Sequence, residues 1–130
     1  MRPGSPNRFA DWLRMIMDRE TPRDWVWAYH VTPEGNLDSI AREGLKPNLH
    51  EHVPDIPVVF VEPDLEGVTP YYGEGMAVLR FKTPGFGTTE DGENVLFAGD
   101  PPFAGPRGEA GAIPPERIQI LVDKKFRWLI

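Results

Sequence analysis

Hydrophobic residues recur with a helical period near the start of the chain, after a polar tail over residues 1–7. The apolar positions that share one side of this helix are Phe9, Trp12, Leu13, Ile16 and Met17. Thr21 and Pro22 end the pattern, because proline lacks the amide hydrogen that continues a helix. The pattern predicts an N-terminal amphipathic helix that packs its apolar side on a sheet.

The next segment predicts a strand, a tight turn and a short helix. Residues 25–30 are rich in aromatic and β-branched residues, which is typical of a strand. Thr32 followed by Pro33 indicates a helix start, with threonine as the N-cap and proline at the first helical position. The short helical face consists of Leu37, Ile40 and Ala41. Gly44 stands where a left-handed cap would end this helix.

Further apolar runs predict strands separated by loops. These runs cover residues 57–61, 76–81, 95–97, 117–122 and 126–130. Residues 46–56 are predicted to form a polar loop, Asp64 opens a weak helical or turn segment, and residues 83–111 are dense in glycine, proline and acidic residues. One or two helices before mostly antiparallel strands give an α+β class, and the length suits a single domain over residues 1–130.

Composition and charge narrow the classes of function. The formal net charge is −6, which argues against a broad surface that follows a nucleic-acid backbone. The chain has no cysteine, so disulfides, thiolate nucleophiles and cysteine-based zinc sites are excluded. No apolar run approaches the roughly 20 residues that span a bilayer, and no signal-peptide pattern is visible. We therefore expect a cytoplasmic protein without membrane association.

The three histidines are the first candidates for chemistry. His30 ends a hydrophobic strand, where a titratable group is either a hydrogen-bonded residue at the edge of the core or a ligand contact. His50 and His52 form a pair in a polar loop, which is conceivable as a metal site. A second cluster of ligands at suitable spacing is missing, so the sequence predicts no metal.

Two other features could serve a ligand. Tyr71 and Tyr72 follow the second strand, where they could stack on a planar ring or pack one side chain into the core. Glu109 lies between Gly108 and Gly111. A glutamate in this setting is either solvated surface or a group that the glycines allow a ligand to approach closely.

Taken in order, these segments resemble the ADP-ribosyltransferase superfamily. Tyr29-His30-Val31-Thr32-Pro33, followed by a short helix and Gly44-Leu45, is similar to the opening of that family, where a strand ends in His-x-Thr or His-x-Ser. The later segments with a resemblance are residues 58–61, 71–72 and 76–81, and then Glu109 with residues 113–118. The resemblance covers residues 27–122 and looks closest to the branch that holds DNA-modifying toxin ADP-ribosyltransferases and RNA 2′-phosphotransferases.

The resemblance implies two small sheets that form a cleft with NAD bent inside it. His30 would hydrogen-bond a ribose hydroxyl, and Thr32 would support that edge. Relatives often have glycine at the position of Val31, whose backbone N–H and C=O would still be offered to the nicotinamide amide. Tyr71 or Tyr72 would stack on the nicotinamide ring, with the choice between them open.

The resemblance also implies a catalytic carboxylate. Glu109 would bond the 2′-hydroxyl of the nicotinamide ribose and stabilise the oxocarbenium-like transition state more than the ground state. NAD is then a substrate, and no metal is required. The candidates to meet the pyrophosphate are Arg42, Lys46 and Arg107.

The acceptor of the ADP-ribose is not identified by the sequence. The acidic residues of the stretch over 83–108 are Glu90, Asp91, Glu93 and Asp100. They would repel a phosphate backbone, so a protein or small-molecule acceptor is favoured over nucleic acid. Two alternatives stay open: a catalytically inactive binding protein of the same fold, and an RNA 2′-phosphotransferase-like enzyme, which would need basic residues around the cleft.

Overall fold

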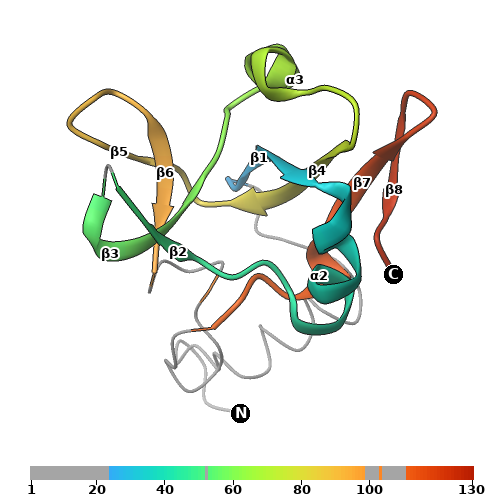
Figure 1. The fold of residues 1–130 in the computed structure, drawn as a ribbon, viewed down its shortest axis with the longest axis horizontal. Coiled ribbons are helices and arrows are strands. Elements are labelled where there is room, and N and C mark those ends of the chain that lie inside the picture. Colours follow the sequence, from blue (N-terminus) through green and yellow to red (C-terminus); the bar gives the residue numbers. More distant parts are fainter. Residues whose placement is uncertain (1–23, 52, 99–102, 104–110) are drawn as a thin grey trace.

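The computed structural model describes residues 24–51, 53–98, 103 and 111–130, which form two four-stranded antiparallel sheets with short helical segments (Figure 1). The first sheet has the order β1-β4-β7-β8, with bounds Val26–Pro33, Met76–Thr83, Gln119–Val122 and Lys125–Trp128. The second has the order β2-β3-β6-β5, with bounds Asn48–His50, Val53–Phe60, Asn94–Phe97 and Gly87–Thr88. The helical segments are η1 (Glu34–Asn36), α2 (Leu37–Glu43), α3 (Leu65–Val68), η2 (Thr69–Tyr71) and η3 (Pro115–Arg117). The predicted α+β class with antiparallel strands is confirmed.

Residues 46–56 were expected to form a loop, and this prediction was wrong. They contain β2 and the start of β3, which form an antiparallel hairpin in which Asn48 faces Val58 and His50 faces Val53. All three residues of β2 are exposed. An edge strand with both faces in water carries no alternation of polar and apolar residues, so the sequence holds no signal for it.

The expected helix start at Thr32 and Pro33 was also wrong. β1 continues through Pro33, because Thr32 and Pro33 pair with Ala77 and Met76 of β4. Thr32 is buried, and its hydroxyl accepts a hydrogen bond from Asn36 Nδ2 at 3.1 Å. The threonine therefore receives a side-chain contact from the following turn instead of capping a backbone amide.

Gly44 ends α2 as expected, although in a different backbone conformation. Its φ of 85° is positive, but its ψ of 178° is extended instead of left-handed helical. Its amide donates to the carbonyl of Ile40 at 2.8 Å, and Leu45 then pairs with Ile113 in an isolated bridge. The glycine thus turns the chain from the helix directly into a short extended contact.

The hydrophobic core is shared by the two sheets. Leu79 and Phe81 of β4 are fully buried, and they belong to the same cluster as Val59 of β3 and Leu96 of β6. This shared packing fixes the position of one sheet against the other. The predicted N-terminal helix, with the tail before it, lies outside the described residues.

Cations and aromatic rings alternate across the first sheet. The Arg80 guanidinium carbon lies 4.0 Å from the ring centroid of Trp27 and 4.0 Å from that of Phe126. Lys82 Nζ lies 4.5 Å from the Trp27 ring, and Arg80 Nε donates to Gln119 Oε1 at 2.7 Å. These contacts connect all four strands of the sheet through side chains. Within the described part of the chain, no helix is both long and apolar enough to cross a membrane.

Candidate functional site

A cleft with two lobes lies along β1. The first, here called the lysine lobe, has a volume of about 430 Å³ and is lined by residues that include Thr32, Ser39 and Lys46. The second, the glutamate lobe, has a volume of about 450 Å³ and is lined by residues that include Glu62, Tyr71 and Glu93. Both lobes are lined by His30, Val31, His50 and Phe60. The four shared residues make the lobes neighbouring parts of one site.

His30 lies at the junction of the lobes in a defined protonation state. Its Nδ1 lies 2.8 Å from the carbonyl oxygen of Phe60. A carbonyl only accepts, so Nδ1 carries the proton. Burial lowers the pKa of His30 most strongly, the hydrogen bond to Phe60 raises it in part, and the nearby His50 lowers it slightly, so that the net shift favours the neutral ring. The remaining ring nitrogen, Nε2, is then a hydrogen-bond acceptor at the cleft.

The lowered pKa of His30 predicts a loss of stability in mild acid. The unfolded chain takes up a proton near pH 6.5, whereas the folded ring resists it. The contribution of His30 is therefore fully present above pH 6.5 and is lost as the pH falls toward the lower pKa of the folded state. Urea denaturation across this range measures the effect.

The control variants separate His30 from other titrating groups. His30→Gln retains an N–H donor for the Phe60 carbonyl but cannot titrate, so it should flatten the pH dependence just below pH 6.5. The exposed His50 is the matched control, and His50→Gln should retain most of the slope. An unchanged slope in His30→Gln would contradict the assignment.

The outer edge of β1 presents unpaired backbone groups to the cleft. Tyr29 exchanges two hydrogen bonds with Glu62 across this edge, at 2.9 and 2.8 Å. In an antiparallel strand every second residue points its N–H and C=O to the same side. The N–H and C=O of Val31 therefore point away from β4, toward the cleft that Val31 lines. Neither group has a partner among the described residues. One donor and one acceptor stand side by side at this edge.

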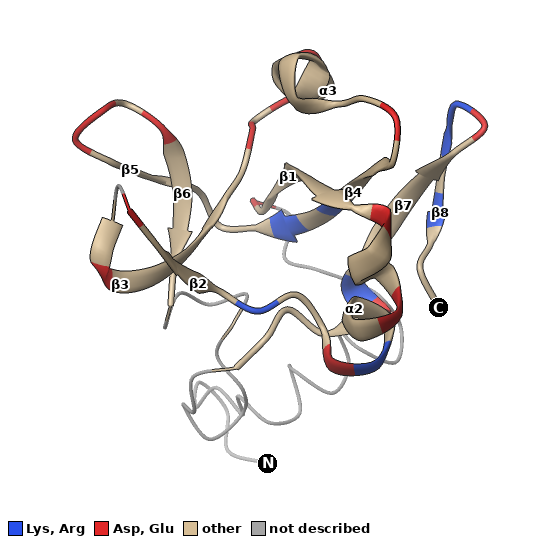
Figure 2. Cartoon of the chain, in the orientation of Figure 1, with Lys and Arg blue, Asp and Glu red and all other residues tan. Residues whose placement is uncertain are grey.

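The glutamate lobe combines an aromatic ring with two carboxyl groups. Tyr71 lines it and is 61% exposed, so its ring is open to a ligand. Tyr72 is 56% exposed and is not among the lining residues, so neither tyrosine packs into the core. Figure 2 shows acidic residues on the segment that joins β3 to α3 and on the loop that joins β5 to β6. Partial burial raises the pKa of Glu62, and Asp64 and Glu93 raise it further.

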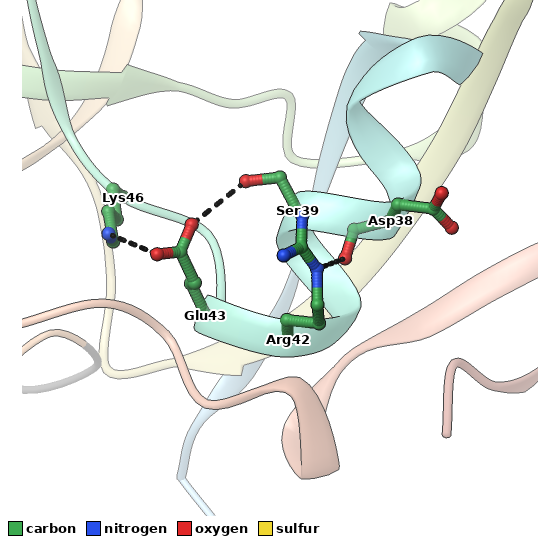
Figure 3. A network of polar contacts seen from close by, with 5 residues as sticks. All are labelled: Asp38, Ser39, Arg42, Glu43 and Lys46. Atoms are coloured by element: carbon green, nitrogen blue, oxygen red, sulfur yellow. Dashed lines mark hydrogen bonds and ion pairs between the residues drawn. The ribbon is translucent and has the colours of Figure 1, made fainter.

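The charged residue that lines the lysine lobe is Lys46, which is paired with a carboxylate. Lys46 Nζ lies 3.6 Å from Glu43 Oε1, and the second oxygen of that carboxylate accepts a hydrogen bond from the Ser39 hydroxyl at 3.1 Å (Figure 3). These contacts lower the pKa of Glu43. Arg42, in contrast, donates from Nε to the carbonyl of Asp38 at 3.2 Å and lies outside both lobes. Contact between Arg42 and the cofactor stays a prediction.

The cleft brings together His30, Val31, Thr32 and Tyr71 of the predicted site. Glu109, Arg107 and His52 lie outside the described residues. Among the residues that the structure describes, no group of three potential ligands could hold a metal ion.

Glu62 was not among the residues predicted from the sequence. Its only signal in the sequence is a charged residue directly after the apolar run over 58–61. A single charge at the end of a strand is usually a solvated residue, and only its pairing with Tyr29 brings it into the cleft. No protein-family model, curated protein or solved structure was found to match this chain.

Proposed function

We propose that this chain is an NAD-dependent ADP-ribosyltransferase, which transfers ADP-ribose to an acceptor and releases nicotinamide. The observation that carries the proposal is the backbone edge at Val31, which has no partner among the described residues and lies in a cavity that Tyr71 also lines. A carboxamide has a carbonyl acceptor and an NH2 group, and the carbonyl with one of the two N–H donors matches the N–H and C=O of a strand edge. A planar ring attached to it would stack on the exposed tyrosine ring.

The neutral state of His30 supports the same ligand. With Nδ1 donating to Phe60, Nε2 accepts a hydrogen bond, and a ribose hydroxyl is a suitable donor. Thr32 lines the adjacent lysine lobe and receives the Asn36 side chain. Its proposed role is to fix the start of the turn beside the ribose.

The opposite charges of the two lobes suit the charges of NAD. The nicotinamide ring of NAD is a cation, which the carboxylates of Glu62 and Glu93 would attract. The diphosphate is an anion, and Lys46 is the charged side chain among the described residues of the other lobe. Of the three cations considered for the pyrophosphate, we therefore assign the role to Lys46.

Catalysis is proposed to depend on charge that develops on the nicotinamide ribose. As the glycosidic bond breaks, the ribose becomes positively charged, and a carboxylate stabilises this state more than the ground state. We assign that role to Glu109 on the resemblance described above. The acidic groups near the glutamate lobe, Glu62, Asp64 and Glu93, favour a protein or small-molecule acceptor over a nucleic acid.

The first test is whether NAD binds and is cleaved. A ligand that binds only the native state adds about 2.7 kcal/mol of stability at a concentration one hundred times its Kd. We expect millimolar NAD to raise the melting temperature, and chromatography to detect released nicotinamide. His30→Ala should reduce the shift, and NADH, whose ring is uncharged, should give a smaller one. A melting curve that NAD does not move would contradict the proposal, and binding without nicotinamide release would indicate the inactive alternative.

A further inference from the structure

Glu62 occupies a defined place beside the proposed nicotinamide site. It is paired with Tyr29, which precedes Val31 by two residues on the same edge of β1. Two residues of a strand span roughly 7 Å. The backbone of Glu62 therefore lies about the length of a nicotinamide group from the N–H and C=O of Val31. A nicotinamide ring that bonds Val31 through its carboxamide can therefore direct its glycosidic nitrogen toward Glu62.

The backbone bridge places the side chain of Glu62 beside that of Tyr29. Directly opposed residues of an antiparallel pair project their side chains to the same face. Tyr29, Val31 and Glu62 all line the glutamate lobe. The Glu62 carboxylate has no hydrogen-bond or ion-pair partner among the described residues, so it is available to a ligand.

We propose that Glu62 is a catalytic residue of the transfer, acting at the ribose carbon that is attacked. This inference rests on the proposed function. The bond between that carbon and the nicotinamide nitrogen breaks, and its electron pair stays on the nitrogen, so that neutral nicotinamide leaves. The Glu62 carboxylate stabilises the cationic ribose. A lone pair of the acceptor then bonds the carbon, and the acceptor's proton passes to Glu62 and from there to water.

The surroundings of Glu62 suit it to receive that proton. Partial burial and the charges of Asp64 and Glu93 raise its pKa, which makes its carboxylate a better base than a solvated glutamate. Glu93 lines the same lobe, just before β6, so the two carboxyl groups are electrostatically coupled. The rate should consequently fall on the acid side of a pH profile, above the ordinary glutamate pKa of 4.5.

The test is nicotinamide release by Glu62→Gln, which is nearly isosteric and removes the charge. We expect release to fall at least about 100-fold, as is typical when one positioned electrostatic group is removed. The melting temperature without ligand should stay close to that of the parent, and the acid limb of the pH profile should move. The matched control is Glu90→Gln in the exposed loop between β5 and β6, which removes the same charge and should leave release unchanged.

Three outcomes separate this inference from the proposed function. Parent-like release by Glu62→Gln, with Glu109→Gln inactive, would overturn the role of Glu62 and leave the proposed function intact. A large decrease in the rate of nicotinamide release by Glu62→Gln, with unchanged binding of free nicotinamide, would support the catalytic role. If the parent protein neither binds nor cleaves NAD, the proposed function fails and Glu62 has no role in this reaction.

Discussion

Replacing Phe81 with alanine should lower the free energy of unfolding by about 3–5 kcal/mol. Phe81 is fully buried, and it faces Ala28 across the pair formed by β1 and β4. Its ring packs in the cluster that both sheets share, so its removal leaves a cavity at the junction of the sheets. Urea denaturation of parent and variant measures the difference.

The exposed Tyr72 provides the control for this prediction. Tyr72→Ala removes a ring that is 56% exposed, and the change in unfolding free energy should stay within about 0.5 kcal/mol. If Phe81→Ala lowered the free energy of unfolding by less than about 1 kcal/mol, a core shared by the two sheets would be contradicted. Large losses from such substitutions arise when a buried cavity is left behind.

Gly44→Ala is the second substitution with a large expected effect. The backbone at Gly44, with φ 85° and ψ 178°, lies in a region that only glycine adopts readily. A residue with a side chain there costs about 1–3 kcal/mol, and its Cβ would also overlap the carbonyl oxygen of Ile113. Gly44 and Leu45 both line the lysine lobe, so the strained segment should also weaken NAD binding.

A second glycine distinguishes conformational strain from a general effect of alanine. A Cβ at Gly85 meets no atom within 4 Å, and its φ lies outside the positive range. Gly85→Ala should therefore leave the melting temperature and the shift with NAD nearly unchanged. Equal melting temperatures for Gly44→Ala and the parent would show that the turn after α2 relaxes without cost.

The strands of the fold were predictable where apolar residues are buried. Leu79 and Phe81 in β4, and Val95 and Leu96 in β6, are buried and stand in runs of strand-forming residues. β2 was not predictable, because all of its residues are exposed and its pairing with β3 is made by backbone groups. The helix start at Thr32 failed because pairing with β4 overrides a local preference for capping.

The predicted residues that line the cleft are three neighbours in the sequence and one exposed aromatic residue, Tyr71. His30, Val31 and Thr32 are consecutive, so one motif could identify them. Glu62 lies two residues beyond the end of β3 and reaches the lobe because its backbone bridges Tyr29. Arg42 was chosen for its charge alone, and the helical turn directs its side chain to the carbonyl of Asp38. Contacts between distant segments depend on register, which the sequence pattern does not specify.

The free edge of β1 also has a consequence for solubility. β1 is an end strand of its sheet, and beyond the bridge to Glu62 the outer edge at Val31 has no backbone partner among the described residues. An edge of this kind is a template onto which a strand of another molecule can add. The opposite end strand, β8, carries Lys125 and Arg127, and charged side chains of this kind discourage such pairing. At Val31, a bound carboxamide would hydrogen-bond the backbone N–H and C=O and so block the addition of another strand. Aggregation during storage should therefore be slower with nicotinamide present, and the empty protein should be the form that self-associates.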